Sequence, residues 1–343
     1  MSKYGFRLFT ASLRKGEGRK AVPFKHTQPD SDLADFIAMV WESRRDVRVI
    51  GLPHEPAPEG EEADGPDRSR DPIFYIEEVA RIGRHIGFKV RYGRPGDHDR
   101  ATSPEGSSFD KDITGLPPTR GYYGFLIVPS GAGDCTGVLA VEAISGACPQ
   151  APLQRWLRQW ASESPVALGP GTAPAWWKLV LKPLGDDELL NSYLRRAQPN
   201  ELVLTRHKER IDRQMQKEEL RLTAAVDTDA ARRATRRELK AWQDAFMSER
   251  PIDRAVAASS VAAILGDEIA EVGFDDVSIR VEDDDFGPRT LTPNSMSDVF
   301  TYQVGDRAPD RDEFLGHVRR AVSRVLYEEK PDFDWTGWPS PRG

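Results

Sequence analysis

Residues 121–146 read GYYGFLIVPSGAGDCTGVLAVEAISG and carry the clearest structural signal in the chain. Two apolar runs, rich in the β-branched and aromatic side chains that favour strands, flank the short polar segment PSGAGD. A Gly-containing segment between two such runs is typical of a hairpin turn. The stretch therefore predicts a β-hairpin with buried strands.

Elements of both kinds surround this hairpin in the first half of the chain. Apolar and polar residues alternate in Tyr4–Arg14, which predicts a strand. The segment from Asp32 to Ser43 has apolar residues at helical spacing behind an N-cap signal, and Leu153 to Trp160 repeats that spacing. We therefore expect a first α+β domain over residues 1–165.

Two stretches of this domain are too polar to pack. Residues 53–71 and 93–118 are rich in Pro, Gly and acidic residues, and such composition buries too little apolar surface to offset the entropy lost on ordering. Both are predicted to be mobile surface loops.

The second half predicts another mixed domain with a helical insertion. A Pro- and Gly-rich linker precedes a strand candidate at Trp176–Leu184, so we place a second α+β domain at 175–305. Helical patterns from Lys208 to Val226, from Ala230 to Arg250 and from Ile252 to Ala270 predict an insertion over 208–270 between strands. A final amphipathic helix and an aromatic tail make up 306–343. The predicted fold class is thus α+β, with two mixed sheet-and-helix domains and a long helical insertion in the second.

Composition excludes several classes of protein. The chain has no apolar run of about 18 residues that could span a bilayer, and no export signal is visible. Two cysteines among 343 residues are too few for a disulfide scaffold, so we expect a reducing cytoplasm and no membrane partner. The net charge is -7, but seven acidic residues fall between Glu55 and Asp71 alone, so the rest of the chain is close to neutral.

Basic residues concentrate in the predicted insertion. Between Arg206 and Lys240 eleven Lys or Arg stand against seven acidic residues, a balance of 11 − 7 = +4. Two arginine doublets lie one helical turn apart and would form a basic stripe that can follow a phosphate backbone without reading sequence. The alternative is a solvated helix laced by ion pairs, such as Asp229 with Arg233. The residues predicted to bind nucleic acid are Arg232, Arg233, Arg236, Arg237 and Lys240, supported by Arg206, Lys208, Arg210 and Arg213.

No catalytic, metal or cofactor motif is expected. The nearest candidate carboxylates for a metal-dependent nuclease are Asp134 on the hairpin turn and Glu142 on the following strand. Ile144 stands where that chemistry needs a lysine. The histidines are scattered, and the glycines of PSGAG match neither a nucleophile elbow nor a phosphate-binding loop.

The order of elements resembles that of the RexA-type phage exclusion proteins. The resemblance rests on YGFRLFT near the amino terminus, on the hairpin of residues 121–146 leading into PLQRWL, and on ELVLTRH before a helical region. It covers about the first two thirds of the chain. It implies a bacterial or phage-borne defence protein that binds double-stranded DNA without strong sequence preference and forms a dimer. The acidic total charge and the longer insertion and tail depart from that family.

These observations give three hypotheses. The first is a non-enzymatic nucleic-acid-binding component of an antiviral defence system. The second is an adaptor that holds a partner protein through the helical insertion and the aromatic tail. The third is a metal-dependent nuclease that uses Asp134 and Glu142.

Overall fold

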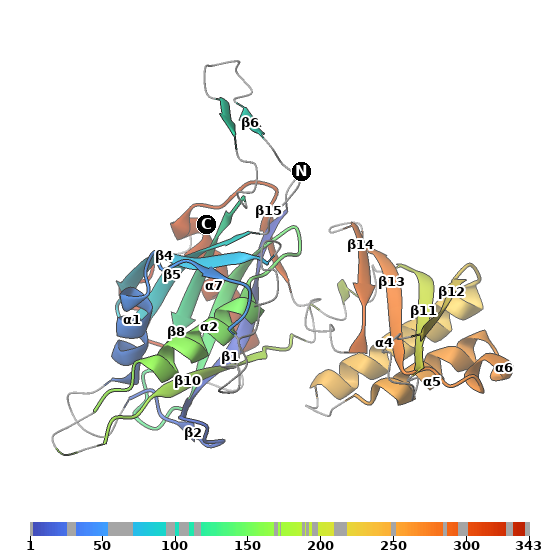
Figure 1. The fold of residues 1–343 in the computed structure, drawn as a ribbon, viewed down its shortest axis with the longest axis horizontal. Helices are drawn as coiled ribbons and strands as arrows, with labels where there is room; N and C mark the ends of the chain where they lie inside the picture. Colours follow the sequence, from blue (N-terminus) through green and yellow to red (C-terminus); the bar gives the residue numbers. More distant parts are fainter. Residues whose placement is uncertain are drawn as a thin grey trace, which may run out of the picture. The chain divides into compact units, whose positions relative to one another are not determined.

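The chain divides into two compact units in a computed structural model (Figure 1). Unit 1 comprises Met1–Leu184 and Tyr302–Gly343, and unit 2 comprises Gly185–Thr301. The structure describes residues 3–25, 32–53, 71–93, 100–102, 110–112, 118–167, 171, 173–186, 189, 192–193, 198–208, 218–247, 252–283, 287–293, 301–326 and 332–339. Among these residues no helix is both long enough and apolar enough to cross a membrane.

Both units combine sheet and helix, so the chain is an α+β protein. The elements of unit 1 are β1 (Tyr4–Lys15), β2 (Ala21–Val22), α1 (Leu33–Ser43), β3 (Val49–Ile50), β4 (Ile73–Ile82), β5 (His85–Gly93), β6 (Arg100–Thr102), β7 (Asp110–Asp112), β8 (Arg120–Ile127), β9 (Thr136–Ile144), α2 (Gln150–Glu163), β10 (Trp177–Pro183), β15 (Tyr302–Gly305) and α7 (Arg311–Val325). Those of unit 2 are β11 (Gln198–Lys208), β12 (Glu218–Ala225), α4 (Asp229–Met247), α5 (Arg254–Leu265), α6 (Asp267–Ala270), β13 (Asp276–Asp283) and β14 (Gly287–Leu291).

Unit 1 is built on an antiparallel sheet with the order β10-β1-β9-β8-β5-β4-β3. The predicted hairpin is confirmed, because β8 and β9 pair antiparallel from Gly124 opposite Val141 to Ile127 opposite Val138. Both strands lie in the interior of the sheet, which explains why their sequences are apolar at nearly every position.

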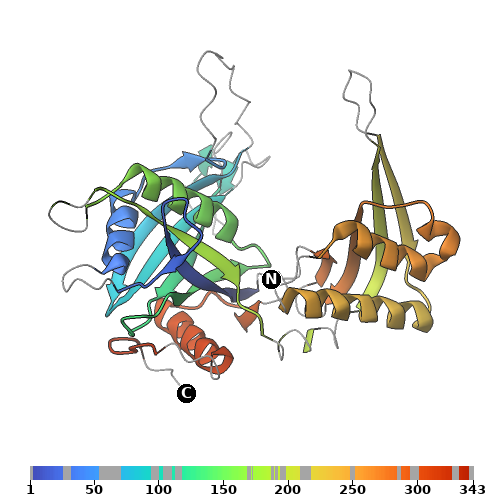
Figure 2. The ribbon, with the colours of Figure 1, turned by 90° about the horizontal axis from the view of Figure 1, so that it is seen from below.

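Helices cover both faces of this sheet (Figure 2). Alternate residues of β1 separate the two faces, because side chains of neighbouring strand residues point in opposite directions. Phe9, Ala11 and Leu13 join the core shared with α1 and α2, whereas Phe6 packs its ring 5.5 Å from that of Phe314 on α7. The core of unit 1 therefore lies in two layers, one on each side of the sheet.

Two elements that we assigned to later domains belong to unit 1. The strand expected to open the second domain, β10, pairs with β1, and β15 pairs with the other end of β1. The predicted boundaries 1–165, 175–305 and 306–343 therefore differ from those observed, and the carboxy-terminal helix and tail are part of unit 1. Apolar alternation predicts a strand but does not identify the strand with which it pairs, and these pairings join residues far apart in sequence.

Unit 2 has a four-stranded antiparallel sheet in the order β12-β11-β13-β14, with helices packed on one face (Figure 2). Its core is made of its own residues, among them Leu202 and Leu204 of β11, Trp242 of α4 and Ile279 of β13. Asp253 caps α5, its carboxylate accepting from the backbone N–H of Ala255 at 2.9 Å.

The predicted helix from Lys208 to Val226 is wrong where the structure describes it. Residues Glu218–Ala225 form β12, which pairs with β11 from Glu201 opposite Ala225 to Lys208 opposite Glu218. Glu, Leu and Arg favour helices, but ladder hydrogen bonds to β11 and the packing of Leu222 on the core override that preference. Among the described residues, the helices α4, α5 and α6 lie between β12 and β13. Most of the two predicted mobile loops, 53–71 and 93–118, lies outside the described residues.

Candidate nucleic-acid interface

The predicted basic stripe lies on α4, and local signals explain why this helix forms. Thr228 precedes the helix, and its hydroxyl accepts from the backbone N–H of Ala231 at 3.1 Å, as an N-cap residue does. Asp229 places a negative charge in the first turn, where the helix dipole favours it. Thr235, Leu239, Trp242 and Gln243 are buried, so one face of α4 is fixed against the sheet of unit 2.

Four cations occupy the opposite face of α4. Arg233, Arg236, Arg237 and Lys240 are all exposed, and their spacing of three, four and seven residues puts them in one row. At 1.5 Å per residue the row is roughly 10 Å long. We call these four residues the α4 basic row.

Few acidic groups neutralise this row. Lys240 lies 3.4 Å from the carboxylate of Asp244, which is an exposed pair of small energetic value. The expected pair of Asp229 with Arg233 is not formed, because Asp229 lies 3.7 Å from Arg232 instead. Within the described part of the chain, Arg233, Arg236 and Arg237 take part in no ion pair.

The other predicted binding residues do not join the row. Arg232 is half-buried, and its Nε donates to the carbonyl of Val226 at 3.3 Å. Arg206 donates to the carbonyl of Val272 at 2.7 Å, which holds the turn after α6. The backbone of Lys208 pairs with Glu218 at the end of β11. Arg210 and Arg213 lie outside the described residues.

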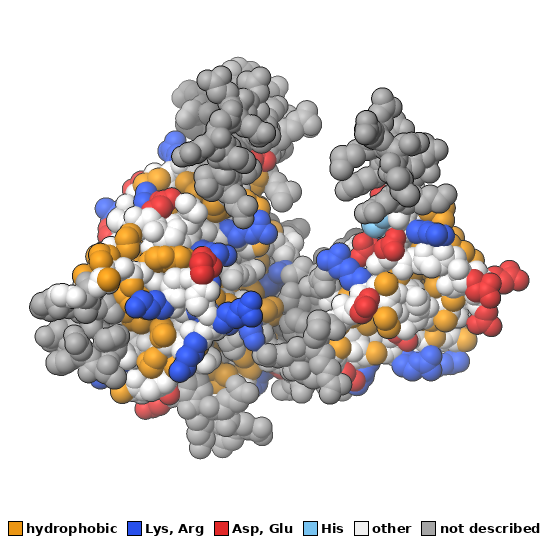
Figure 3. Space-filling model, turned by 60° about the horizontal axis from the view of Figure 1, so that its bottom comes forward, with side chains coloured by type: hydrophobic (Ala, Val, Ile, Leu, Met, Phe, Trp, Pro, Cys, Tyr) orange, Lys and Arg blue, Asp and Glu red, His pale blue; other side chains and the backbone are white. Residues whose placement is uncertain are grey.

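On the side drawn in Figure 3, Lys and Arg side chains form separate groups with apolar and uncharged atoms between them. Charge scattered in this way attracts polyanions only weakly on the side shown. Binding at a defined place therefore depends on local rows such as that of α4.

The two carboxylates of the nuclease hypothesis are not brought together. Asp134 lies in the turn before β9 and accepts from the backbone N–H of Gly131 at 3.2 Å, whereas Glu142 lies near the other end of β9. Six steps of extended strand, roughly 20 Å, separate Glu142 from Thr136 at the start of β9. Among the residues that the structure describes, no group of three or more His, Cys, Asp or Glu side chains could hold a metal ion.

Glu142 is instead an isolated buried carboxyl. It is only 4% exposed and accepts from the backbone N–H of Tyr123 at 2.9 Å, just beyond the last paired residues of β8 and β9. Burial raises the pKa of Glu142 to about 7, against the opposing influence of the Tyr123 hydrogen bond and of Lys89 and Arg120. The sequence showed only a single charged position in an apolar strand.

The aromatic tail, which the adaptor hypothesis assigned to a partner, packs on the sheet of unit 1. Trp338 is buried, and its indole N–H donates to the carbonyl of Leu315 on α7 at 2.9 Å. Trp338 and Trp335 also contact the ring of His85 on β5. Nothing in the sequence around His85 distinguished it from the other histidines. No family model, curated protein or solved structure matches this chain.

Proposed function

We propose that this protein binds nucleic acid without catalysing a reaction, and that the α4 basic row contacts the phosphate backbone. The observation that carries the proposal is the row itself, in which three exposed arginines have no ion-pair partner among the described residues. The proposed role in antiviral defence comes from the resemblance to the phage exclusion proteins.

The chemistry of the row suits phosphate and not base recognition. Guanidinium groups donate two parallel hydrogen bonds to a phosphate and stay charged at all physiological pH values. Because the row lies on one exposed helix face, several of its members can contact one strand together. Contacts of this kind position the protein on nucleic acid but do not read its sequence.

The test is an anisotropy titration with labelled double-stranded DNA, single-stranded DNA and RNA at several salt concentrations. We expect the logarithm of the binding constant to fall linearly with the logarithm of the salt concentration. Changing Arg233, Arg236, Arg237 and Lys240 together to Gln should reduce that slope by about 3 to 4, since each phosphate contact contributes about 0.9. Arg232 is left unchanged because it holds the start of α4.

A matched control separates the row from net charge. Lys15, Arg19, Lys20 and Arg155 are four exposed cations of unit 1, and their change to Gln alters the net charge by the same amount. This control should keep the slope of the wild-type protein. Equal losses in both variants would show that the effect comes from total charge, and an unchanged slope in the α4 variant would refute the assignment.

A further inference from the structure

His85 connects the sheet of unit 1 to the carboxy-terminal tail. Its side chain is fully buried, the backbone N–H of Val128 donates to Nδ1 at 3.1 Å, and Nε2 lies 2.8 Å from the carbonyl oxygen of Asp334. Its ring centroid lies 5.7 Å from that of Trp335 and 5.3 Å from that of Trp338.

These contacts determine the protonation state of the ring. Nδ1 accepts a hydrogen bond and so carries no proton, whereas Nε2 faces a carbonyl oxygen and must carry one. His85 is therefore the neutral Nε2–H tautomer when the tail is docked. A second proton on Nδ1 would point at the N–H of Val128, replace a hydrogen bond by two opposed donors and leave a charge in a buried site.

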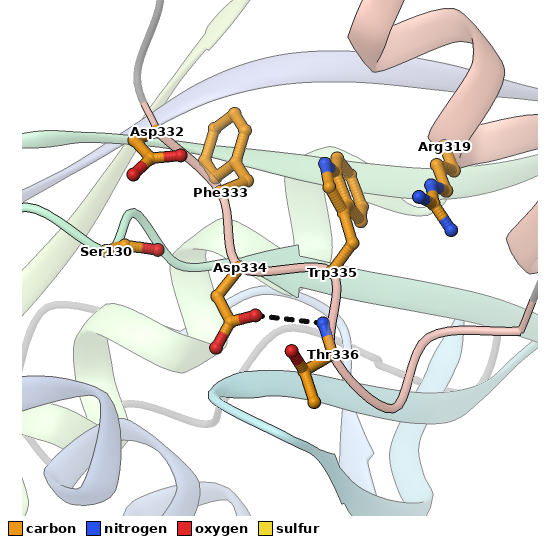
Figure 4. A pocket seen from close by; sticks show the side chains of 7 residues that line it. All are labelled: Ser130, Arg319, Asp332, Phe333, Asp334, Trp335 and Thr336. Atoms are coloured by element: carbon orange, nitrogen blue, oxygen red, sulfur yellow. Dashed lines mark hydrogen bonds between the residues drawn. The ribbon is translucent and has the colours of Figure 1, made fainter.

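Two further hydrogen bonds connect the described part of the tail to the rest of unit 1. The backbone N–H of Ser130 donates to the carbonyl of Asp332 at 2.7 Å, and Trp338 is bound to Leu315 as described above. Figure 4 shows Phe333 and Trp335 pointing to one side of the tail and Asp334 and Thr336 to the other. An open cavity of about 660 Å³ lies beside this segment and is partly lined by Ser130 and Arg319, so the tail is not enclosed there.

We propose that residues Asp332–Pro339, here called the strap, form a pH-sensitive device: neutral His85 holds the strap on the sheet, and protonation of His85 releases it. Release uncovers Phe125, whose ring centroid lies 5.8 Å from that of Trp338, and the backbone of Leu315. The aromatic surface beneath the strap then becomes available for contacts that it cannot make at neutral pH.

The surrounding charges support this direction. Burial lowers the pKa of His85 below its ordinary value, and Arg84 and Arg81 of the same hairpin act in the same sense. The hydrogen bond to the Asp334 carbonyl and the Asp334 carboxylate oppose the shift without reversing it. Arg84 is itself paired with Asp32 at 2.8 Å and Arg81 with Asp35, while Arg319 of α7 lies over the ring of Trp335.

The sign of the pH effect follows from linkage. A released His85 titrates near its ordinary value of about 6.5, and the docked one titrates lower, so the released state binds more protons between the two values. Docking is fully favoured above that ordinary value and weakens as the pH falls toward the lowered pKa of docked His85. Each unit between the two pKa values corresponds to an about tenfold change in the ratio of docked to released strap.

The experiment is ¹⁹F NMR of the full chain labelled with 5-fluorotryptophan between pH 8 and pH 5. Trp335→Phe and Trp338→Phe variants assign the two strap resonances. In the wild-type protein we expect the Trp338 resonance to move from a buried to an exposed shift below about pH 6.5. A resonance that stays at its buried shift throughout would overturn the proposal.

Two variants test whether His85 is the group that titrates. His85→Gln retains one acceptor and one donor but cannot be protonated, so its strap should stay docked at pH 5; release with the wild-type midpoint would overturn the proposal.

Asp334→Asn keeps the backbone carbonyl and an acceptor for the N–H of Thr336, but removes the charge that favours protonated His85. Because that charge stabilises protonated His85 only in the docked state, its loss should weaken docking at acidic pH and move the release midpoint to higher pH. This variant keeps the proposal testable even if the Gln variant does not dock, and a midpoint moved to lower pH would overturn the proposal.

Discussion

At the scale of single residues, the buried carboxyl of Glu142 makes stability depend on pH. Its pKa is raised from 4.5 to about 7, so the protonated form is favoured in the fold, and stability is lost as the pH rises through this range. The change Glu142→Gln keeps an acceptor for the N–H of Tyr123 and removes the charge. It should stabilise the protein by about 1 to 3 kcal/mol at pH 8 and by much less at pH 5.

Urea unfolding of both proteins at the two pH values measures this difference, with Glu78→Gln as the control. Glu78 is a half-exposed carboxylate on β4 of the same sheet, 3.6 Å from Arg311, and its change should have a small effect at both pH values. A Glu142→Gln variant that is equally destabilised at both pH values would contradict the burial argument.

Sequence reasoning placed Glu142 on a strand but did not reveal that it is buried. Burial of this side chain depends on Phe6, which lies opposite it on β1, and on the position where the pairing of β8 and β9 ends. His85 was missed for the same reason, because its partner Asp334 lies 249 residues further along the chain. Hydrophobic periodicity reports the face on which a residue lies and not what a distant segment brings to it.

At the scale of elements, helices with strong local signals were predictable. The helix predicted from Ala230 to Arg250 is α4, observed at Asp229–Met247, and its basic row follows from helical spacing alone. Which arginines stay unpaired was not predictable, because Arg232 and Arg233 differ only in what lies beside them. The strand β12 was missed because its pairing with β11, and not its own composition, decides its conformation.

The amino-terminal cap of α7 is a testable element of this kind. Asp310 accepts from the backbone N–H of Glu313 at 2.8 Å, and Glu313 accepts from the N–H of Asp310 at 3.1 Å, which is a capping box. Asp310→Ala should lower the free energy of unfolding of unit 1 by about 1 kcal/mol, measured by urea unfolding. Asp310→Ser should retain most of it. An equal loss in Asp312→Ala, an exposed residue of the same first turn, would show that the cap is not responsible.

At the scale of the whole molecule, the sequence of unit 2 interrupts that of unit 1 between β10 and β15, which both pair with β1. The backbone N–H of Leu184 donates to the carbonyl of Leu8, and Tyr302 lies opposite Phe6 on the same strand. Leu184, where the chain leaves unit 1, and Tyr302, where it returns, thus lie beside two residues of β1 that are two positions apart. The gap between them is roughly 7 Å. The sequence did not predict this arrangement, since the composition of β10 and β15 does not show that both pair with β1.

This arrangement predicts that unit 1 does not need unit 2 in order to fold. A four-residue Gly/Ser linker spans up to about 13 Å, so it can join Leu184 to Tyr302 in place of residues 185–301. We expect this shortened chain to unfold in one cooperative urea transition, and residues 185–301, whose core is their own, to do the same separately. A chain that ends at Leu184 lacks β15 and α7, so Phe6 and Phe125 lose Phe314 and it should aggregate. If the linked chain aggregates in the same way as the truncated chain, unit 1 depends on unit 2 for its folding and the insertion model is wrong.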